Sequence, residues 1–181
     1  MEKTMDKVSW KAKWRIDKFK DPTGEIAKML IMGASMTEVM RQFSEAFIAT
    51  EEFESNIALN EGLQALIGLA CAIGAETAWS NAAAYLGVGD SNAAEDADHT
   101  GLQAATNKLW KAMDATYPQR TNQTCDWRAT FGSADANYAW EEYTVVNAAD
   151  DMGKNLNRKI ASKGTKASGE SWTLSLQITF S

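Results

Sequence analysis

The stretch Thr124–Ala149, TCDWRATFGSADANYAWEEYTVVNAA, decides how this chain folds. From Cys125 to Phe131 apolar residues alternate with polar ones, which is the pattern of a strand with one buried face. Small, turn-forming residues follow at 132–137, and a second run of aromatic and β-branched residues occupies 138–146. Two such runs joined by a short polar loop predict an antiparallel hairpin that serves as scaffold.

Alternation of the same kind marks both ends of the chain. Val8–Ile16 places apolar residues at even positions and mostly basic residues between them, which predicts a long strand. Trp172–Phe180 alternates without a break, so Trp172 is expected in the core and Thr173 on the opposite face. We therefore expect Trp172→Ala to cost about 3–5 kcal/mol and Thr173→Ala well under ~1 kcal/mol.

Helical signals are concentrated in the first 75 residues. A short apolar-rich piece covers 25–32, and Ser35 with Glu38 forms a capping box that precedes a helical face. Residues 63–73 predict a helix that is apolar nearly all round, and such a helix should be covered by the sheet or by a neighbouring subunit. Further short strands are predicted at residues 53–59, 84–89, 108–114 and 156–161.

Together these elements predict an α+β, mainly β protein. Several strands without a βαβ rhythm are typical of an antiparallel β-sandwich. We expect residues 76–181 to form the sandwich body. Residues 1–75 are expected to form a helical and partly extended N-terminal region that contacts neighbouring subunits.

Length and composition are those of a globular protein. The chain has 181 residues, of which 45% are hydrophobic and 23% charged, enough to bury a sizeable core. The net charge of −6 is unevenly spread: residues 1–20 carry seven basic and three acidic side chains, and residues 61–103 carry six acidic and no basic ones. Overall acidity speaks against nucleic-acid binding, whereas the basic start could meet an acidic protein surface.

The sequence lacks the features of disulfide-rich, secreted and membrane-spanning proteins. Cys71 and Cys125 are too few for a disulfide framework and are expected to be small buried hydrophobes. The first residues lack the apolar core of a signal peptide. The longest apolar run, at 63–75, is shorter than the roughly 20 residues that span a bilayer. We therefore expect a soluble protein of a reducing compartment with no membrane partner.

No residue set predicts catalysis, a metal or a cofactor. His99 is the one histidine, which excludes a His-based triad and a multi-histidine metal site. Glu141 and Glu142 are adjacent on a strand pattern and should face opposite ways, so they are not an acid–base pair. The acidic loop with Asp90, Glu95, Asp96 and Asp98 offers oxygen ligands for calcium, but its spacing is not that of an EF-hand, which favours a solvated loop.

Five segments in order resemble a group of tailed-bacteriophage virion structural proteins, and the resemblance covers about residues 56–181. The segments are NEGLQALIGL, AAYLGVGDSNAA, LQAATNKLWKAMDATYPQR, WRATFGSADANYAWEEYTVVNAA and LNRKIASKGTKASGESWTLSLQITFS. The shared motifs are structural, so the resemblance implies a virion role, associated with the head region, and carries over no catalytic or ligand residue.

The resulting expectation is a virion structural protein, made in the host cytoplasm, that is not an enzyme. The role expected first is that of a capsid decoration or cement protein. Such a protein would be homo-oligomeric and would bind the major capsid protein or other virion proteins. A tail or tail-adaptor/fibre-base component is the alternative. A carbohydrate-binding module, with Trp110 and Trp127 as candidate platforms, is an alternative of another class. The residues expected at the interface are Val8, Trp10, Lys11, Lys13, Trp14, Arg15 and Ile16.

Overall fold

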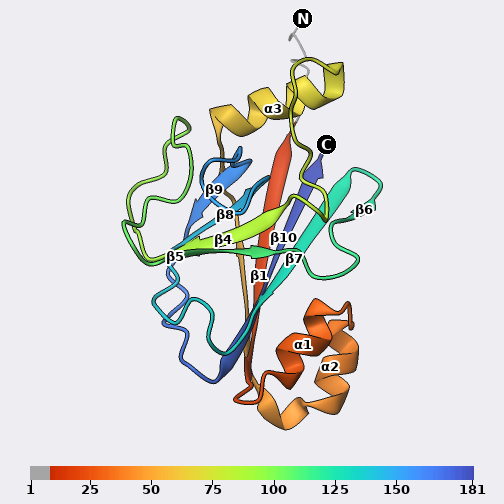
Figure 1. Ribbon diagram of the computed structural model, residues 1–181, viewed down its shortest axis with the longest axis vertical. Helices are drawn as coiled ribbons and strands as arrows, with labels where there is room; N and C mark the ends of the chain where they lie inside the picture. The colour runs from red at the N-terminus through yellow and green to blue at the C-terminus, as the bar shows by residue number, and fades with distance from the viewer. Residues whose placement is uncertain (1–8) are drawn as a thin grey trace, which may run out of the picture.

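Two five-stranded antiparallel sheets pack against each other in the computed structural model, which describes residues 9–181 (Figure 1). The first sheet has the order β2-β1-β10-β7-β6 and is built from β1 (Trp10–Lys20), β2 (Phe47–Glu54), β6 (Gln119–Thr121), β7 (Thr124–Phe131) and β10 (Glu170–Phe180). The second has the order β3-β9-β8-β4-β5 and is built from β3 (Ile57–Ala58), β4 (Tyr85–Gly89), β5 (Lys108–Ala112), β8 (Glu142–Val146) and β9 (Asn157–Ile160). The predicted mainly β sandwich is confirmed.

The core lies between the sheets and is rich in aromatic residues. Trp140, which precedes β8, is fully buried, and its ring centroid lies 4.8 Å from that of Phe131 and 4.9 Å from that of Trp172, both near edge-on. Edge-to-face contacts of this kind add to the free energy gained from burial alone. The alternation seen in the sequence places the apolar members of β1, β7 and β10 on this inner face.

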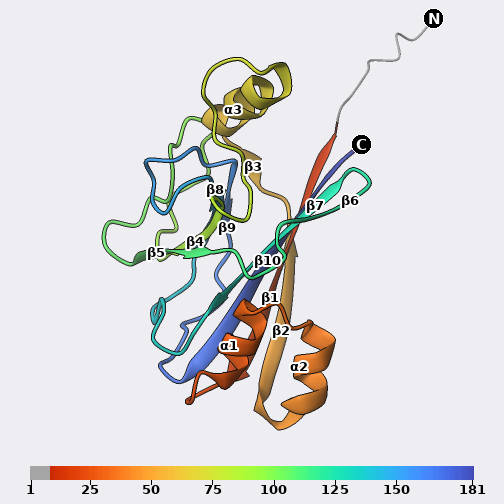
Figure 2. The ribbon, with the colours of Figure 1, turned by 45° about the vertical axis from the view of Figure 1, so that its right-hand side comes forward.

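Two short helices cover one half of the outer face of the first sheet (Figure 2). They are α1 (Glu25–Ile31) and α2 (Met36–Gln42), followed by a 3₁₀ turn, η1 (Ser44–Ala46). Phe19 of β1 packs with α1 and α2 in a second, smaller core. The Ser35 hydroxyl accepts a hydrogen bond from the Glu38 backbone N–H at 3.1 Å, which confirms the predicted cap.

A buried ion pair fastens these helices to the sheet. Arg128 of β7 lies on the outer face, where its Nε donates to Asp114 at 2.8 Å and its guanidinium also donates to the backbone oxygens of Leu30 and Ala34. Asp114 accepts further hydrogen bonds from the backbone and the hydroxyl of Thr130. Burial raises the pKa of Asp114, although Arg128 and Thr130 oppose that shift.

The hairpin predicted for 124–146 is wrong. β7 belongs to the first sheet, where β10 and β6 are its partners, whereas β8 belongs to the second sheet beside β4 and β9. The small residues of 132–137 lead the chain across from one sheet to the other. The physical reason is that alternation determines which face of a strand is buried, but it says nothing of the strand alongside.

The expected boundary near residue 75 does not separate an arm from a body. β1 lies between β2 and β10 and pairs with β10 along its whole length, from Trp10↔Phe180 to Lys20↔Glu170. The N-terminal strand is therefore a central strand of the sandwich. Sequence distance misled the prediction, because the first and last strands of the described chain are neighbours.

The connection between β4 and β5 contains the acidic loop, which is tied down by a second buried ion pair. Arg158 of β9 donates to Glu142 of β8 at 2.8–2.9 Å, and both side chains are fully buried. The same guanidinium donates to the backbone oxygens of Ala93 and Ala94, at 3.1 and 3.2 Å. The loop is thus attached to the second sheet rather than free in solvent.

Candidate interaction surface

The helix α3 (Asn60–Cys71) presents apolar side chains to solvent at the end of the molecule opposite α1 and α2 (Figure 1). Ile67 is 64% exposed, and Ile73, just beyond the helix, is 69% exposed. Leu63 and Leu69 are also exposed, at 38% and 36%. We call this set, together with exposed Cys71, the α3 surface. The sequence predicted that this helix would be covered, and the described chain leaves most of its C-terminal half uncovered.

Small residues seat the first turns of α3 on the second sheet. Gly62 is buried, and a β-carbon there would lie 2.5 Å from the Leu156 Cα, so any larger residue would push the helix away. Glu61, in the first turn of the helix, accepts a hydrogen bond from the Asn155 backbone N–H at 2.8 Å. The helix is therefore held in place while its large apolar side chains remain unburied.

One acidic side chain, Glu76, flanks the α3 surface, where it packs over Gly68. The sequence has no lysine or arginine between residues 61 and 103. An apolar area beside an acid, without a nearby base in this stretch of the sequence, favours a partner with an apolar groove and a basic rim.

The structure buries some of the residues predicted at the interface and exposes others. Trp14 and Ile16 are fully buried in the protein's own core, so they are not available to a partner. Lys11 and Lys13 are exposed, and Arg15 is half-buried on the same outer face of β1. Trp10 is half-buried, and its indole N–H donates to Asn56 Oδ1 at 2.8 Å. Val8 lies outside the described residues.

The basic face of β1 is largely neutralised within the first sheet. Lys13 is 2.9 Å from Glu52 of β2, and Arg15 donates two hydrogen bonds to Asp17, at 2.7 and 2.8 Å. The Arg15 pKa is raised, chiefly by the hydrogen bonds to Asp17. Lys11 has no carboxylate within ion-pair distance among residues 9–181. Lys20, at the other end of β1, is likewise exposed and unpaired within residues 9–181, so Lys11 and Lys20 are the β1 cations most available to a partner.

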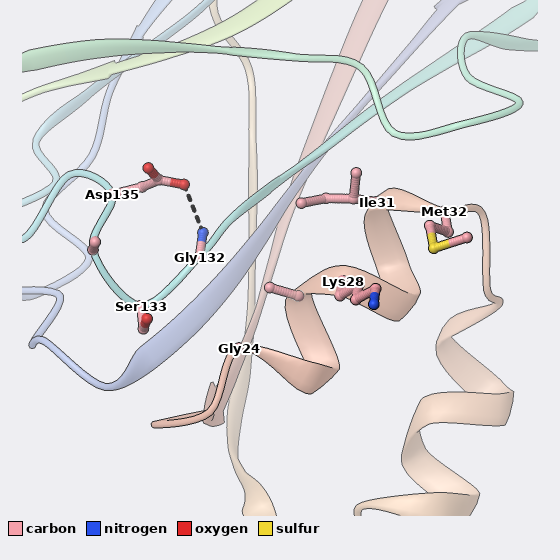
Figure 3. A pocket seen from close by; sticks show the side chains of 9 residues that line it. Gly24, Lys28, Ile31, Met32, Gly132, Ser133 and Asp135 are labelled. Carbon is pink, nitrogen blue, oxygen red and sulfur yellow. Dashed lines mark hydrogen bonds between the residues drawn. The ribbon is translucent and has the colours of Figure 1, made fainter.

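A shallow cleft of about 360 Å³ lies between α1 and the segment 132–135 (Figure 3). Its one carboxylate is already paired: Asp135 accepts from the Gly132 backbone N–H at 2.9 Å and binds Lys111 at 2.6 Å. Beneath it, buried Lys166 donates to the Gly132 oxygen and to Asn137 Oδ1, and burial lowers the pKa of Lys166 to about 8. We therefore regard this cleft as part of the scaffold.

The acidic loop uses its side chains internally. Glu95 accepts from the Ile160 backbone N–H at 2.7 Å, and Asp98 accepts from Asn60 at 2.6 Å. Within residues 9–181 no group of three or more His, Cys, Asp or Glu side chains is placed to hold a metal ion. The loop is better described as a structural connection than as a solvated one.

The tryptophans named for a carbohydrate platform do not form one. Trp127 is 6% exposed, and its indole N–H donates to the Trp79 oxygen at 3.3 Å, inside the core. Trp110 lies on β5, in the other sheet, with a ring that contacts Gly87. Two tryptophans from different sheets, one of them buried, do not give a single stacking face.

Neither a family model, nor a curated protein, nor a solved structure matches this chain. No helix within residues 9–181 has the length and apolar character needed to cross a membrane.

The two cysteines should react very differently, contrary to the expectation that both are buried. Cys71 is exposed on the α3 surface, whereas burial raises the pKa of the Cys125 thiol to about 11. Because the thiolate is the nucleophile, we expect Cys125 to be alkylated at pH 8 much more slowly than the exposed Cys71. Mass spectrometry after iodoacetamide treatment should show one rapid adduct, at Cys71, and a slower second one that denaturation accelerates. Equal rates at both positions in the native protein would contradict the described partial burial of Cys125.

Proposed function

We propose that this protein is a structural subunit of a bacteriophage virion that attaches to another virion protein through the α3 surface. The observation that carries the proposal is the exposure of large apolar side chains along one helix, from Leu63 to Ile73. The resemblance of the five sequence segments to virion structural proteins supports the particle as the setting. Within the virion, a capsid decoration or cement protein bound to the major capsid protein is the leading form.

The α3 surface can contribute much of an anchor. Fully burying an exposed large aliphatic side chain contributes about 1.5–3 kcal/mol. The four aliphatic members are 36–69% exposed, which together equals about two fully exposed side chains, so they offer roughly 3–6 kcal/mol before the costs of association. Helices of this kind commonly insert into an apolar groove of the partner. Glu76, which flanks the surface, would then meet a basic residue at the rim of the groove.

A charge introduced on the α3 surface should abolish attachment without unfolding the protein. We expect Ile67→Glu and Ile73→Glu to reduce co-sedimentation with particles lacking the protein by at least about tenfold, because each would bury a charge in an apolar contact. Met152→Glu is the matched control, since Met152 is an equally apolar side chain, 90% exposed, in a separate loop. All three variants should keep the wild-type thermal melt.

Incorporation of the α3 variants at wild-type levels would refute attachment through α3.

The number of copies per particle separates the two virion roles, capsid decoration and tail component. Hundreds of copies indicate a decoration protein on the capsid, and a handful indicates the tail or tail-adaptor/fibre-base alternative. A preparation of native particles, with the protein quantified by mass spectrometry against an isotope-labelled standard, gives this number directly.

A further inference from the structure

The strand β1 is longer than its neighbour β2 at one end. β1 pairs with β10 from Trp10 onward, but its pairing with β2 begins only at Lys13↔Glu54. Ser55, with a φ of 65°, turns the chain away at this point, and it continues into β3 in the other sheet. Trp10, Lys11 and Ala12 therefore have no strand beside them on the β2 side within residues 9–181.

Backbone hydrogen-bonding groups of β1 face this vacant side. Ser9 exchanges both of its backbone hydrogen bonds with Ser181, at 2.6 and 2.9 Å, on the β10 side. Since successive residues of a strand direct their backbone groups to opposite sides, those of Trp10 and Ala12 face the other way. The Ala12 oxygen confirms this, because it accepts from the Ser55 N–H at 3.1 Å. The N–H and C=O of Trp10 and the N–H of Ala12 then remain for an incoming strand.

A groove of about 480 Å³ lies beside this edge. Trp10, Lys11, Ser55 and Asn56 line it, and Glu54 of β2 with outer-face residues of β1 and β10 completes the lining. Lys11 brings a positive charge with no carboxylate partner among the described residues. The Asn56 Nδ2 is buried and has no hydrogen-bond acceptor within residues 9–181. Lys11 and the Asn56 amide are donors, so they favour a ligand that supplies carbonyl and carboxylate oxygens.

The protein's own β2 shows what kind of strand fits beside β1. Glu54 and Glu52 stand opposite Lys13 and Arg15 on the outer face. Between them Phe53 stacks on Trp14 on the inner face, with ring centroids 6.0 Å apart. Acidic residues on one face and an aromatic residue on the other thus complement β1 at Lys13–Arg15, the paired residues next to the free edge.

We propose that the free edge of β1 at Trp10–Ala12 binds an extended segment of a partner protein, which continues the line of β2. The segment alternates acidic and apolar residues, so that a carboxylate meets Lys11 while an apolar side chain lies beside Trp10. Strand addition of this kind gains affinity from main-chain hydrogen bonds and specificity from the alternate side chains. The site is separate from the α3 surface and does not depend on the function proposed for it.

The probe is a peptide with the sequence of β2 itself, acetyl-Thr-Glu-Glu-Phe-Glu-amide, corresponding to residues 50–54. We expect millimolar peptide to shift the backbone amide signals of Trp10 and Ala12 and the indole signal of Trp10 in a saturable manner in ¹H–¹⁵N spectra of the full chain. Lys11→Glu should weaken binding by about tenfold through charge repulsion. Lys20→Glu is the matched control at the far, exposed end of the same strand and should leave binding unchanged.

A peptide methylated on alternate backbone nitrogens separates strand addition from simple charge attraction. It retains every side chain but lacks the backbone N–H donors on the side of the peptide that would face β1, so it should not bind. Equal binding by the methylated peptide, equal binding by Lys11→Glu, or the absence of saturable shifts would each overturn the proposal. Binding that appears only after removal of residues 1–8 would also overturn it, because the chain's own N-terminal segment would then be the occupant.

Discussion

Replacing Arg158 with methionine is expected to lower the free energy of unfolding by about 3–5 kcal/mol, because it leaves the Glu142 carboxylate buried without its counter-ion. Both side chains of the pair are fully buried in the second sheet. Glu142 would retain only the backbone N–H groups of Gln103 and Ala104, at 2.9 and 2.7 Å. A buried carboxylate with two neutral donors is much less stable than one that also binds a guanidinium.

The same replacement should loosen the acidic loop. The Arg158 guanidinium donates to the backbone oxygens of Ala93 and Ala94 and lies 3.2 Å from His99 Nδ1. Without it, hydrogen exchange should accelerate at residues 91–104 before it changes in the first sheet. This local effect distinguishes the loss of an anchor from a uniform loss of stability.

Urea denaturation of the variants in a double-mutant cycle measures the interaction free energy between Glu142 and Arg158. Glu142→Gln combined with Arg158→Met should be less destabilising than the sum of the two single changes, because the double variant leaves no uncompensated charge. Lys154→Met serves as the control, since the Lys154 ammonium is largely exposed and 3.9 Å from Glu61, and it should cost under ~1 kcal/mol. An Arg158→Met variant as stable as this control would show that the pair does not hold the loop.

Local patterns predicted the strands and their buried faces but not their partners. The alternation in Cys125–Phe131 and Trp172–Phe180 correctly identified which side chains enter the core, because side-chain direction follows from the strand alone. Pairing depends on residues far apart in the chain. β10 lies between β1 and β7, at least 150 residues from the first of them in sequence, and no local signal indicates such neighbours.

The basic charge of the N-terminal segment was also interpreted without knowledge of the strand that lies beside it. Seven basic residues in the first twenty suggested an arm that meets an external acidic surface. In the structure the acidic surface is β2: Glu52 lies 2.9 Å from Lys13 and 3.7 Å from Arg15, and Glu51 pairs with Lys18. Opposite charges in successive segments of the sequence would have been the signal that these two strands are cross-strand neighbours.

The exposure of α3 could not be predicted for a different physical reason. A helix that is apolar all round has no polar face to mark its solvent side, so periodicity does not show which residues are covered. The glycine and alanine that seat it, Gly62 and Ala65, are the buried members, whereas the larger Ile67 and Ile73 are exposed. Close approach to Leu156 requires small residues, and this requirement outweighs the burial of large ones.

Thr173→Ala is now expected to cost about 1–2 kcal/mol rather than well under 1, because the outer face of β10 is partly covered by α1. Thr173 is fully buried, and its hydroxyl lies 3.1 Å from that of Thr130, which itself donates to Asp114. Removing the Thr173 hydroxyl therefore deletes a buried hydrogen bond and leaves space in a packed layer. The error in the sequence-based expectation was to equate the face opposite the core with solvent.

Trp172→Ala on the inner face remains the larger loss, at about 3–5 kcal/mol, since its ring packs 4.9 Å from Trp140 and beneath the Lys18 ammonium. Thr179→Ala is the matched control: it lies on the same strand and the same face as Thr173, and its hydroxyl likewise pairs with a threonine of β7, Thr124, at 2.8 Å. That pair is only half-buried, so water can replace the lost partner and the cost should stay below ~0.5 kcal/mol.

Urea melts of the three variants should thus rank Trp172→Ala first, Thr173→Ala second and Thr179→Ala last. Equal losses for the two threonine variants would show that α1 does not seal the outer face at Thr173, and the ion pair of Arg128 with Asp114 would then be open to solvent as well.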